Sequence, residues 1–138
     1  MGQITKGRVL DSNILIYHIN GQLDPSVERA IFCCIEQPAY VSVITSMEVL
    51  SWPGHSDESI AVTSALMEAF NEIALGKEIK SSAITIRRLY RLKLPDAIIA
   101  ATALFLGMPL VTRNIKDFKD IPDLKLVNPF EQSNPPVH

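Results

Sequence analysis

The most informative stretch of the sequence, residues 8–20, reads RVLDSNILIYHIN. Its first part is a short apolar run that ends in Asp11, which predicts a strand followed at once by an acid. Residues 12–20 are mostly apolar and precede Gly21, a pattern typical of a short, mostly buried helix that glycine closes. Asp11 is therefore expected at the carboxyl end of a buried strand, where a lone charge needs a partner.

The rest of the chain alternates between strand and helix patterns. Besides residues 8–11, strands are predicted at residues 39–44, 110–112 and 124–127, with a very short one at 78–79. Besides residues 12–20, helices are predicted from Pro25 to before Pro38, at residues 45–52, from Ser56 through Ile73 to Gly76, and at residues 82–92 and 96–106. This order predicts an α/β fold: a three-layer sandwich with a central, mainly parallel sheet of four or five strands and helices on both faces.

Length and composition fit one globular domain, which we assign to residues 1–130, followed by a polar tail at 131–138. The 138 residues are 47% hydrophobic and 20% charged, which excludes an intrinsically disordered chain. The start shows no signal-peptide pattern, and residues 98–111 are too short for a membrane helix, so we expect a cytoplasmic protein without a membrane anchor. The adjacent Cys33 and Cys34 are expected to be small buried hydrophobes, with a metal or redox pair as the alternative.

The net charge of −2 at first argues against a nucleic-acid binder. However, this value is the sum of two opposed regions. Residues 77–93 contain six basic residues and one acidic residue, hence +5, whereas the rest contains seven basic and fourteen acidic residues, hence −7. The charge therefore does not exclude a protein that binds nucleic acid through one basic segment.

Four carboxylates stand where strands end or helices begin: Asp11, Glu48, Asp96 and Asp117. In a parallel α/β sheet the functional crevice lies outside the carboxyl ends of the strands, so these acids are expected to converge. Several like charges in one place favour either protonation or a bound hard cation. Mg²⁺ or Mn²⁺ suits an all-oxygen set of ligands.

Each acid also has a purely structural interpretation, which the residues alone leave open. Asp11 could cap the helix that follows it, and Asp96 could complement a helix dipole. Thr45 and Glu48 have the spacing of a capping box, and Asn114 and Asp117 could cap a turn in the same way.

Four segments of the chain resemble, in order, the acidic motifs of PIN-domain nucleases. They are VLDSNIL at residues 9–15, VSVITSMEVL at 41–50, LPDAIIAATA at 94–103 and LVTRNIKDF at 110–118. The resemblance extends over residues 9–130 and is greatest for the VapC-type toxins of bacterial toxin–antitoxin pairs.

The resemblance implies a Mg²⁺- or Mn²⁺-dependent ribonuclease whose core acids are Asp11, Glu48 and Asp96. It leaves two candidates for the fourth metal ligand, Asp117 and Asn114, of which Asp117 is the preferred carboxylate. It also implies residues that orient the site, namely Ser12, Asn13 and Thr112. A cognate antitoxin and a homodimer are the implied partners.

Substrate contact requires cations, and we predict that these are Arg87, Arg88, Arg91, Lys93 and Arg113. Arg87 and Arg91 are expected to share a helix face, for which a merely solvated surface is the alternative. A second alternative for the whole chain is a catalytically silent PIN-fold module that binds RNA or protein. A phosphoaspartyl enzyme of the haloacid-dehalogenase type is disfavoured, because that family has an aspartate where Asn13 stands.

Overall fold

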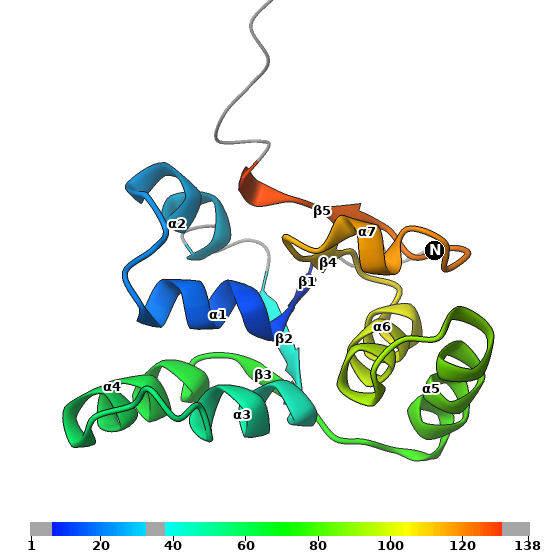
Figure 1. Cartoon of the computed structure of the whole chain (residues 1–138), viewed down its shortest axis with the longest axis horizontal. Helices are drawn as coiled ribbons and strands as arrows, with labels where there is room; N and C mark the ends of the chain where they lie inside the picture. The colour runs from blue at the N-terminus through cyan, green and yellow to red at the C-terminus, as the bar shows by residue number, and fades with distance from the viewer. Residues whose placement is uncertain (1–6, 33–37, 131–138) are drawn as a thin grey trace, which may run out of the picture.

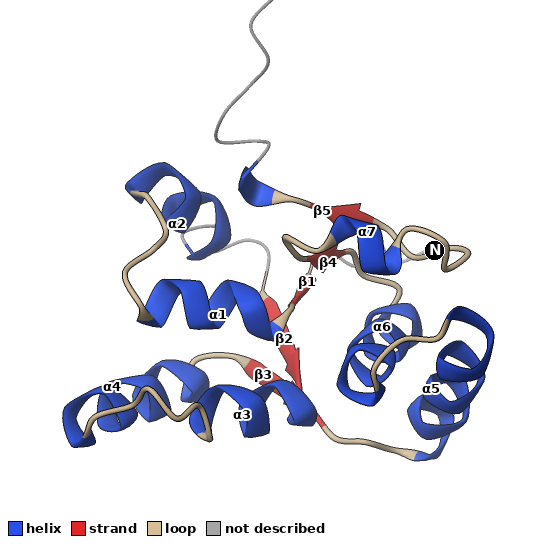
Figure 2. Cartoon of the chain, in the orientation of Figure 1, coloured by secondary structure: helices blue, strands red, loops and turns tan. Residues whose placement is uncertain are grey.

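The computed structural model describes residues 7–32 and 38–130, and within them a five-stranded sheet lies between two groups of helices (Figures 1 and 2). The strands are β1 (Arg8–Leu10), β2 (Ala39–Ser42), β3 (Asn71–Ile73), β4 (Leu110–Val111) and β5 (Leu126–Val127). The helices are α1 (Ser12–Ile19), α2 (Pro25–Phe32), α3 (Val43–Leu50), α4 (Asp57–Glu68), α5 (Lys77–Tyr90), α6 (Leu94–Leu106) and α7 (Ile115–Phe118).

The strand order is β3-β2-β1-β4-β5, and all the neighbouring strands are parallel. The predicted α/β architecture is therefore confirmed, with five strands in the described part of the chain. The chain moves outward from β1 to β2 and β3, and then returns to the other side of β1 for β4. This reversal lies between β1 and β4, and ligands bind at such a point in open α/β sheets.

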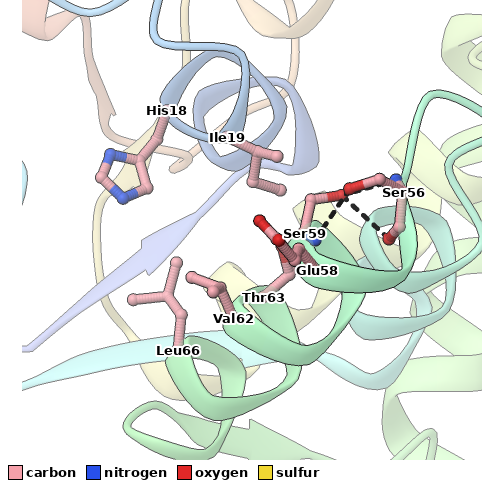
Figure 3. A pocket seen from close by; sticks show the side chains of 8 residues that line it. All are labelled: His18, Ile19, Ser56, Glu58, Ser59, Val62, Thr63 and Leu66. Carbon is pink, nitrogen blue, oxygen red and sulfur yellow. Dashed lines mark hydrogen bonds between the residues drawn. The ribbon is translucent and has the colours of Figure 1, made fainter.

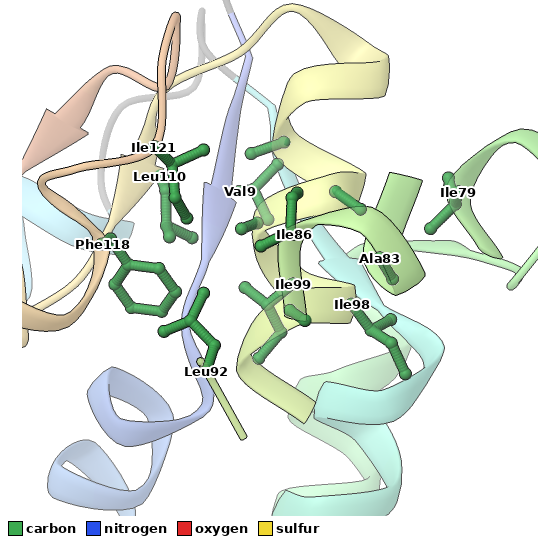
Figure 4. Packing of buried hydrophobic residues seen from close by; sticks show 14 of the residues in the cluster. Val9, Ile79, Ala83, Ile86, Leu92, Ile98, Ile99, Leu110, Phe118 and Ile121 are labelled. Carbon is green, nitrogen blue, oxygen red and sulfur yellow. The ribbon is translucent and has the colours of Figure 1, made fainter. Parts of the chain in front are cut away.

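Alternate residues of the central strands face opposite helical layers, as the period of a strand requires. Val9 and Leu110 face one core with α5 and α6, whereas Leu10, Val41 and Val111 face the other core with α1 to α4. Figure 4 shows the first core, in which Phe118 of α7 packs beside Leu110 and Leu92. The two cores hold the sheet rigidly, so the residues that follow its strands are fixed in place.

The predicted third strand was misplaced along the chain. Residues 71–73 form β3 and pair with β2, although Ile73 had been assigned to the preceding helix. Glu78 and Ile79, assigned to a very short strand, lie in the first turn of α5, which begins at Lys77 rather than Ser82. The reason is that β3 depends on hydrogen bonds to β2, a tertiary contact that local periodicity does not encode.

The helix after β2 begins earlier than predicted, at Val43 rather than Thr45. Ser42 is its N-cap, and the Ser42 hydroxyl accepts a hydrogen bond from the Ile44 amide at 3.1 Å. The proposed capping box of Thr45 and Glu48 is therefore wrong, because both residues already lie inside the helix. This frees the Glu48 carboxylate for a role other than capping.

Other helix ends follow the sequence signals. Asp24 accepts from the Val27 amide at 3.0 Å at the start of α2, and Pro95 occupies the first turn of α6. Gly107 closes α6 at φ 66°, where a residue with a side chain would be strained. No helix among the described residues has the length and hydrophobicity needed to cross a membrane. The predictions for Cys33, Cys34 and the 131–138 tail lie outside the described residues.

Candidate active site

A polar cavity of about 330 Å³ opens at the carboxyl edge of the sheet. It is lined by residues from α1, from α3, from the α5–α6 connection and α6, and from the segment after β4. These are Asn13, Glu48, Arg91, Leu92, Lys93, Pro95, Asp96, Asn114 and Asp117. Three of the four predicted acids therefore line one cavity, as the convergence argument requires.

The fourth acid, Asp11, is buried behind this lining with only 2% of its surface exposed. It is the N-cap residue of α1, but its side chain makes no capping hydrogen bond. Instead its Oδ2 accepts from the Thr112 hydroxyl at 2.7 Å, across the reversal between β1 and β4. Asp11 therefore occupies the N-cap position without a side-chain capping bond in the helix geometry, and the Thr112 hydroxyl is the group that holds its carboxylate.

Burial is the main reason that the pKa of Asp11 is raised to about 6. The hydrogen bond from Thr112 opposes this rise, whereas the negative charges of Asp96 and Glu48 add to it. The pKa of Asp96 is also raised, first by burial and then by the charges of Glu48 and Asp117, while Lys93 opposes the rise. The four acids therefore interact electrostatically as one group.

Glu48 is held by hydroxyl groups rather than by a basic residue. Its Oε1 accepts from the Ser12 hydroxyl at 2.6 Å, and the Ser12 and Thr45 hydroxyls lie 3.2 Å apart. Ser12 thus orients Glu48 from the first turn of α1. Thr45 is a supporting residue that sequence reasoning missed, and its signal was a hydroxyl three residues before the acid, which had been interpreted as a cap.

The chemistry of these donors fits a divalent cation. Among the described residues, no group of three His, Cys, Asp or Glu side chains is arranged so that it could hold a metal ion, and none of the four acids forms an ion pair. Mg²⁺ does not require three such side chains, because it commonly binds one or two carboxylates and keeps several water ligands. A bound cation would relieve the repulsion by which neighbouring carboxylates raise the pKa values of Asp11 and Asp96.

The two asparagines take the positions expected of them at the cavity. Asn13 lines it from α1, and Asn114 lines it from the N-cap position of α7. The Asn114 side chain makes no capping hydrogen bond, and its backbone amide donates to the Thr112 hydroxyl at 2.9 Å. Thr112 therefore connects Asp11 with the segment that carries Asn114 and Asp117.

The predicted basic residues divide into three groups. Arg91 and Lys93 line the cavity, whereas Arg87 and Arg88 are exposed on α5 and do not line it. Arg91 does not continue the helix face of Arg87, because it ends α5 in the left-handed conformation at φ 58°. Arg113 is not part of the lining, and its guanidinium carbon lies over two aromatic rings, 5.1 Å from the centre of Tyr17 and 4.6 Å from that of Phe130.

Comparisons with known proteins agree with this fold. The family model of the PIN domain matches residues 8–124. No curated protein sequence is significantly similar to the chain.

Similar solved structures come from toxin–antitoxin complexes. A chain of a toxin–antitoxin complex from Klebsiella pneumoniae is 34% identical, with a TM-score of 0.75 over 89% of this chain and 98% of that one. VapBC2 from Rickettsia felis, bound to a promoter DNA fragment, gives 0.75 at 23% identity over 88% of this chain and 97% of that one. VapBC-1 from nontypeable Haemophilus influenzae has a TM-score of 0.74 at 24% identity, over 89% of this chain and 98% of that one. The last two structures, at less than 25% identity, show the fold alone. The match to the PIN domain model extends over most of the chain and includes the four acids. The chain therefore belongs to the PIN domain family.

Proposed function

We propose that this protein is a ribonuclease dependent on Mg²⁺ or Mn²⁺, and that it is the toxin of a toxin–antitoxin pair. The observation that carries the nuclease proposal is the electrostatic group of Asp11, Glu48, Asp96 and Asp117 around one cavity at the carboxyl edge of the sheet. The toxin assignment is supported by the similarity to a chain of the complex from Klebsiella pneumoniae. The protein is expected to act in the cytoplasm.

The proposed role of each carboxylate follows from how deeply it is buried. Asp96 and Glu48 line the cavity and are half-buried, so they are the acids that would hold a cation there. Asp11 is held behind them by Thr112, and Asp117 or Asn114 completes the ligands from α7. When bound, the divalent cation supplies activation of a water molecule and neutralises charge on the phosphodiester.

Arg91 and Lys93 are the cations best placed to bind the phosphates that flank the cleaved bond. Both line the cavity wall, and the charge of Lys93 opposes the rise in the pKa of Asp96. The exposed Arg87 and Arg88 extend this positive surface along α5. RNA would therefore approach along α5 and enter the cavity at Arg91.

Arg91→Gly is expected to weaken RNA binding severalfold without destabilising the protein. A left-handed backbone costs an arginine roughly 1 kcal/mol that glycine does not lose, so the melting temperature should hold or rise. Loss of one phosphate contact should lower the slope of log affinity against log salt by about 0.7. Binding of a fluorescent single-stranded RNA across a salt series measures both effects.

Asp123→Gly is the matched control, because Asp123 is the other described residue with a side chain at positive φ, at 67°, and it does not line the cavity. It makes the same backbone change and should leave RNA binding unaltered. Equal RNA affinity in Arg91→Gly and wild type would remove Arg91 from the proposed interface.

The function is tested by incubating purified protein with end-labelled RNA and Mg²⁺, with and without chelator. We expect cleavage that the chelator stops and products with 5′-phosphate and 3′-hydroxyl ends. RNA binding without cleavage would instead support a catalytically silent PIN-fold module. Hydrolysis of small phosphate esters but not of RNA would support phosphoaspartyl chemistry.

An antitoxin is the expected partner, and a groove of about 310 Å³ between α1 and α4 is the surface that we assign to it. Figure 3 shows Ile19 of α1 facing Val62 and Leu66 of α4 across this groove, with His18 and Glu58 also lining it. Val62 is 70% exposed and lies beside Leu66 and Ile19, so the three form a small apolar patch in this groove. Ile14 and Leu15 of α1 and Val49 of α3 are buried in the core and do not contribute to this surface.

Val62→Glu is expected to abolish neutralisation by the antitoxin while RNA cleavage continues. A carboxylate in the apolar groove would lose hydration whenever the partner covered it. The measurement is growth of cells that express the protein with the product of its neighbouring gene, compared with Ala61→Glu at an adjacent exposed position of α4. Full neutralisation of the Val62→Glu protein would show that the antitoxin binds elsewhere. The expected homodimer is a separate prediction, which light scattering of the purified chain tests.

A further inference from the structure

Beside the acidic cavity, three side chains from distant parts of the chain form one cluster, which we call the Tyr17–Arg113–Phe130 cluster. The Arg113 guanidinium carbon lies 5.1 Å from the ring centre of Tyr17 and 4.6 Å from that of Phe130. The two rings meet edge to face, with centres 6.0 Å apart at 75°. Tyr17 comes from α1, Arg113 follows β4, and Phe130 follows β5.

Two residues of the cluster are close neighbours of the two asparagines that line the cavity. Tyr17 lies four residues after Asn13 on α1, so the two share a helix face. Arg113 directly precedes Asn114 in the chain, and both asparagines line the cavity. A nucleotide next to a phosphate bound at the acids would therefore lie near this cluster on the side of Asn13 and Asn114.

The arginine in this cluster is prepared for a ligand rather than used by the fold. Arg113 is exposed, and it forms no ion pair within the described part of the chain. Two aromatic rings nevertheless hold its guanidinium group in position, which limits the rotamer freedom that a solvated arginine normally keeps. Arg113 is thus an exposed planar cation that the rings hold in place, directly before the cavity residue Asn114.

We propose that the Tyr17–Arg113–Phe130 cluster is a nucleobase subsite, on which a base next to the cleaved phosphodiester of single-stranded RNA stacks. This inference rests on the proposed ribonuclease function and adds a residue that distinguishes bases from bare phosphates. Unstacked bases of single-stranded RNA are bound by aromatic rings and by guanidinium planes. A lysine at position 113 would keep the charge but lose the plane.

The test compares two fluorescent RNA octamers that carry equal numbers of phosphates, one of adenosines and one of abasic nucleotides. Binding is measured with chelator present, so that no cleavage occurs. Wild type is expected to bind the adenosine octamer about tenfold more tightly than the abasic one. Arg113→Lys should lose most of this preference while it keeps the salt dependence of binding.

Arg29→Lys on the exposed surface of α2 is the matched control and should keep the full preference. Phe130→Leu, which removes one ring, should lose the preference as Arg113→Lys does, and melting curves establish that each variant is folded. Full preference for adenosine in both cluster variants would overturn the subsite. Equal binding of both octamers by wild type would also overturn it while leaving the ribonuclease proposal intact, whereas absence of Mg²⁺-dependent RNA cleavage by the same protein would contradict the ribonuclease proposal itself.

Discussion

Asp96→Asn is expected to reduce cation-dependent RNA cleavage by about a thousandfold or more. Asp96 lines the cavity at the first turn of α6, and its carboxylate interacts with the charges of Glu48 and Asp117. An asparagine keeps the shape but removes the charge that attracts a divalent cation, whose transition-state stabilisation amounts to several kcal/mol. Single-turnover cleavage of a labelled RNA at saturating Mg²⁺ measures the loss.

Asp57→Asn makes the same chemical change at the exposed first turn of α4, away from the cavity, and should cleave at the wild-type rate. A melting temperature of Asp96→Asn at or above that of wild type would exclude unfolding as the cause. If the Asp96→Asn protein cleaved RNA within a few-fold of wild type, Asp96 would have no place in the catalytic set.

Asp11→Asn is expected to stabilise the cation-free protein at neutral pH. Burial raises the pKa of Asp11 from 3.8 to about 6, so the folded state holds a proton that the unfolded state releases. Stability from this group is therefore full below about pH 4 and is lost as the pH rises through about 6. The free energy of unfolding lost above pH 6 is about 3 kcal/mol, since each unit of pKa shift corresponds to about 1.36 kcal/mol. Asparagine carries no charge and avoids this loss.

Thermal unfolding in chelator between pH 4 and pH 8 measures this effect. The wild-type melting temperature should fall as the pH rises, that of Asp11→Asn should fall less, and the two should differ by roughly 5–10 °C at pH 7. Asp24→Asn is the control with the opposite pKa shift, because hydrogen bonds from Val27 and Ser26 lower the pKa of Asp24. Removal of the Asp24 charge should therefore not raise the melting temperature. Parallel pH curves for wild type and Asp11→Asn would contradict the effect of Asp11 burial.

The predicted effects of Asp96→Asn and Asp11→Asn have one cause: the carboxylates needed for cleavage destabilise the cation-free protein. A buried carboxylate surrounded by other carboxylates is unfavourable in the cation-free fold, and Thr112 and Ser12 offset only part of that cost through hydrogen bonds. Addition of the cation should offset the rest of this stability cost, because the cation is expected to bind the folded arrangement of these acids and not the unfolded chain. The site is therefore expected to be stabilised by the same ion that makes it active.

The sequence predicted the layers of this fold because its central strands and helices carry strong local signals. Asp24-Pro25, Pro95 and Gly107 mark helix ends where the structure has them. By contrast, β3 could not be predicted from residues 71–73, since a three-residue strand at the edge exists only through its pairing with β2. The same reasoning explains why Ile73 fitted a helical pattern equally well.

The acids of the site were predictable, but the groups that hold them were only partly so. The position of Asp11 after a buried strand indicated a carboxylate in need of a partner, and Thr112, a hundred residues away, is that partner. The backbone conformation of Arg91 was not predictable, because arginine rarely adopts positive φ and nothing local requires it here. The Tyr17–Arg113–Phe130 cluster depends on three separate segments, which local patterns do not relate to one another.

The central claim is that this carboxylate cavity makes the chain a cation-dependent ribonuclease, and the most direct measurement is the cleavage rate against cation concentration. Protein stripped of metal with chelator is mixed with labelled single-stranded RNA, and Mg²⁺ or Mn²⁺ is then titrated back, with Asp96→Asn purified in parallel. The account predicts no cleavage before the titration, a saturable rise in rate for wild type, and no rise for the variant. Cleavage at the same rate with and without the cation, or no RNA cleavage at any concentration of either ion, would contradict it.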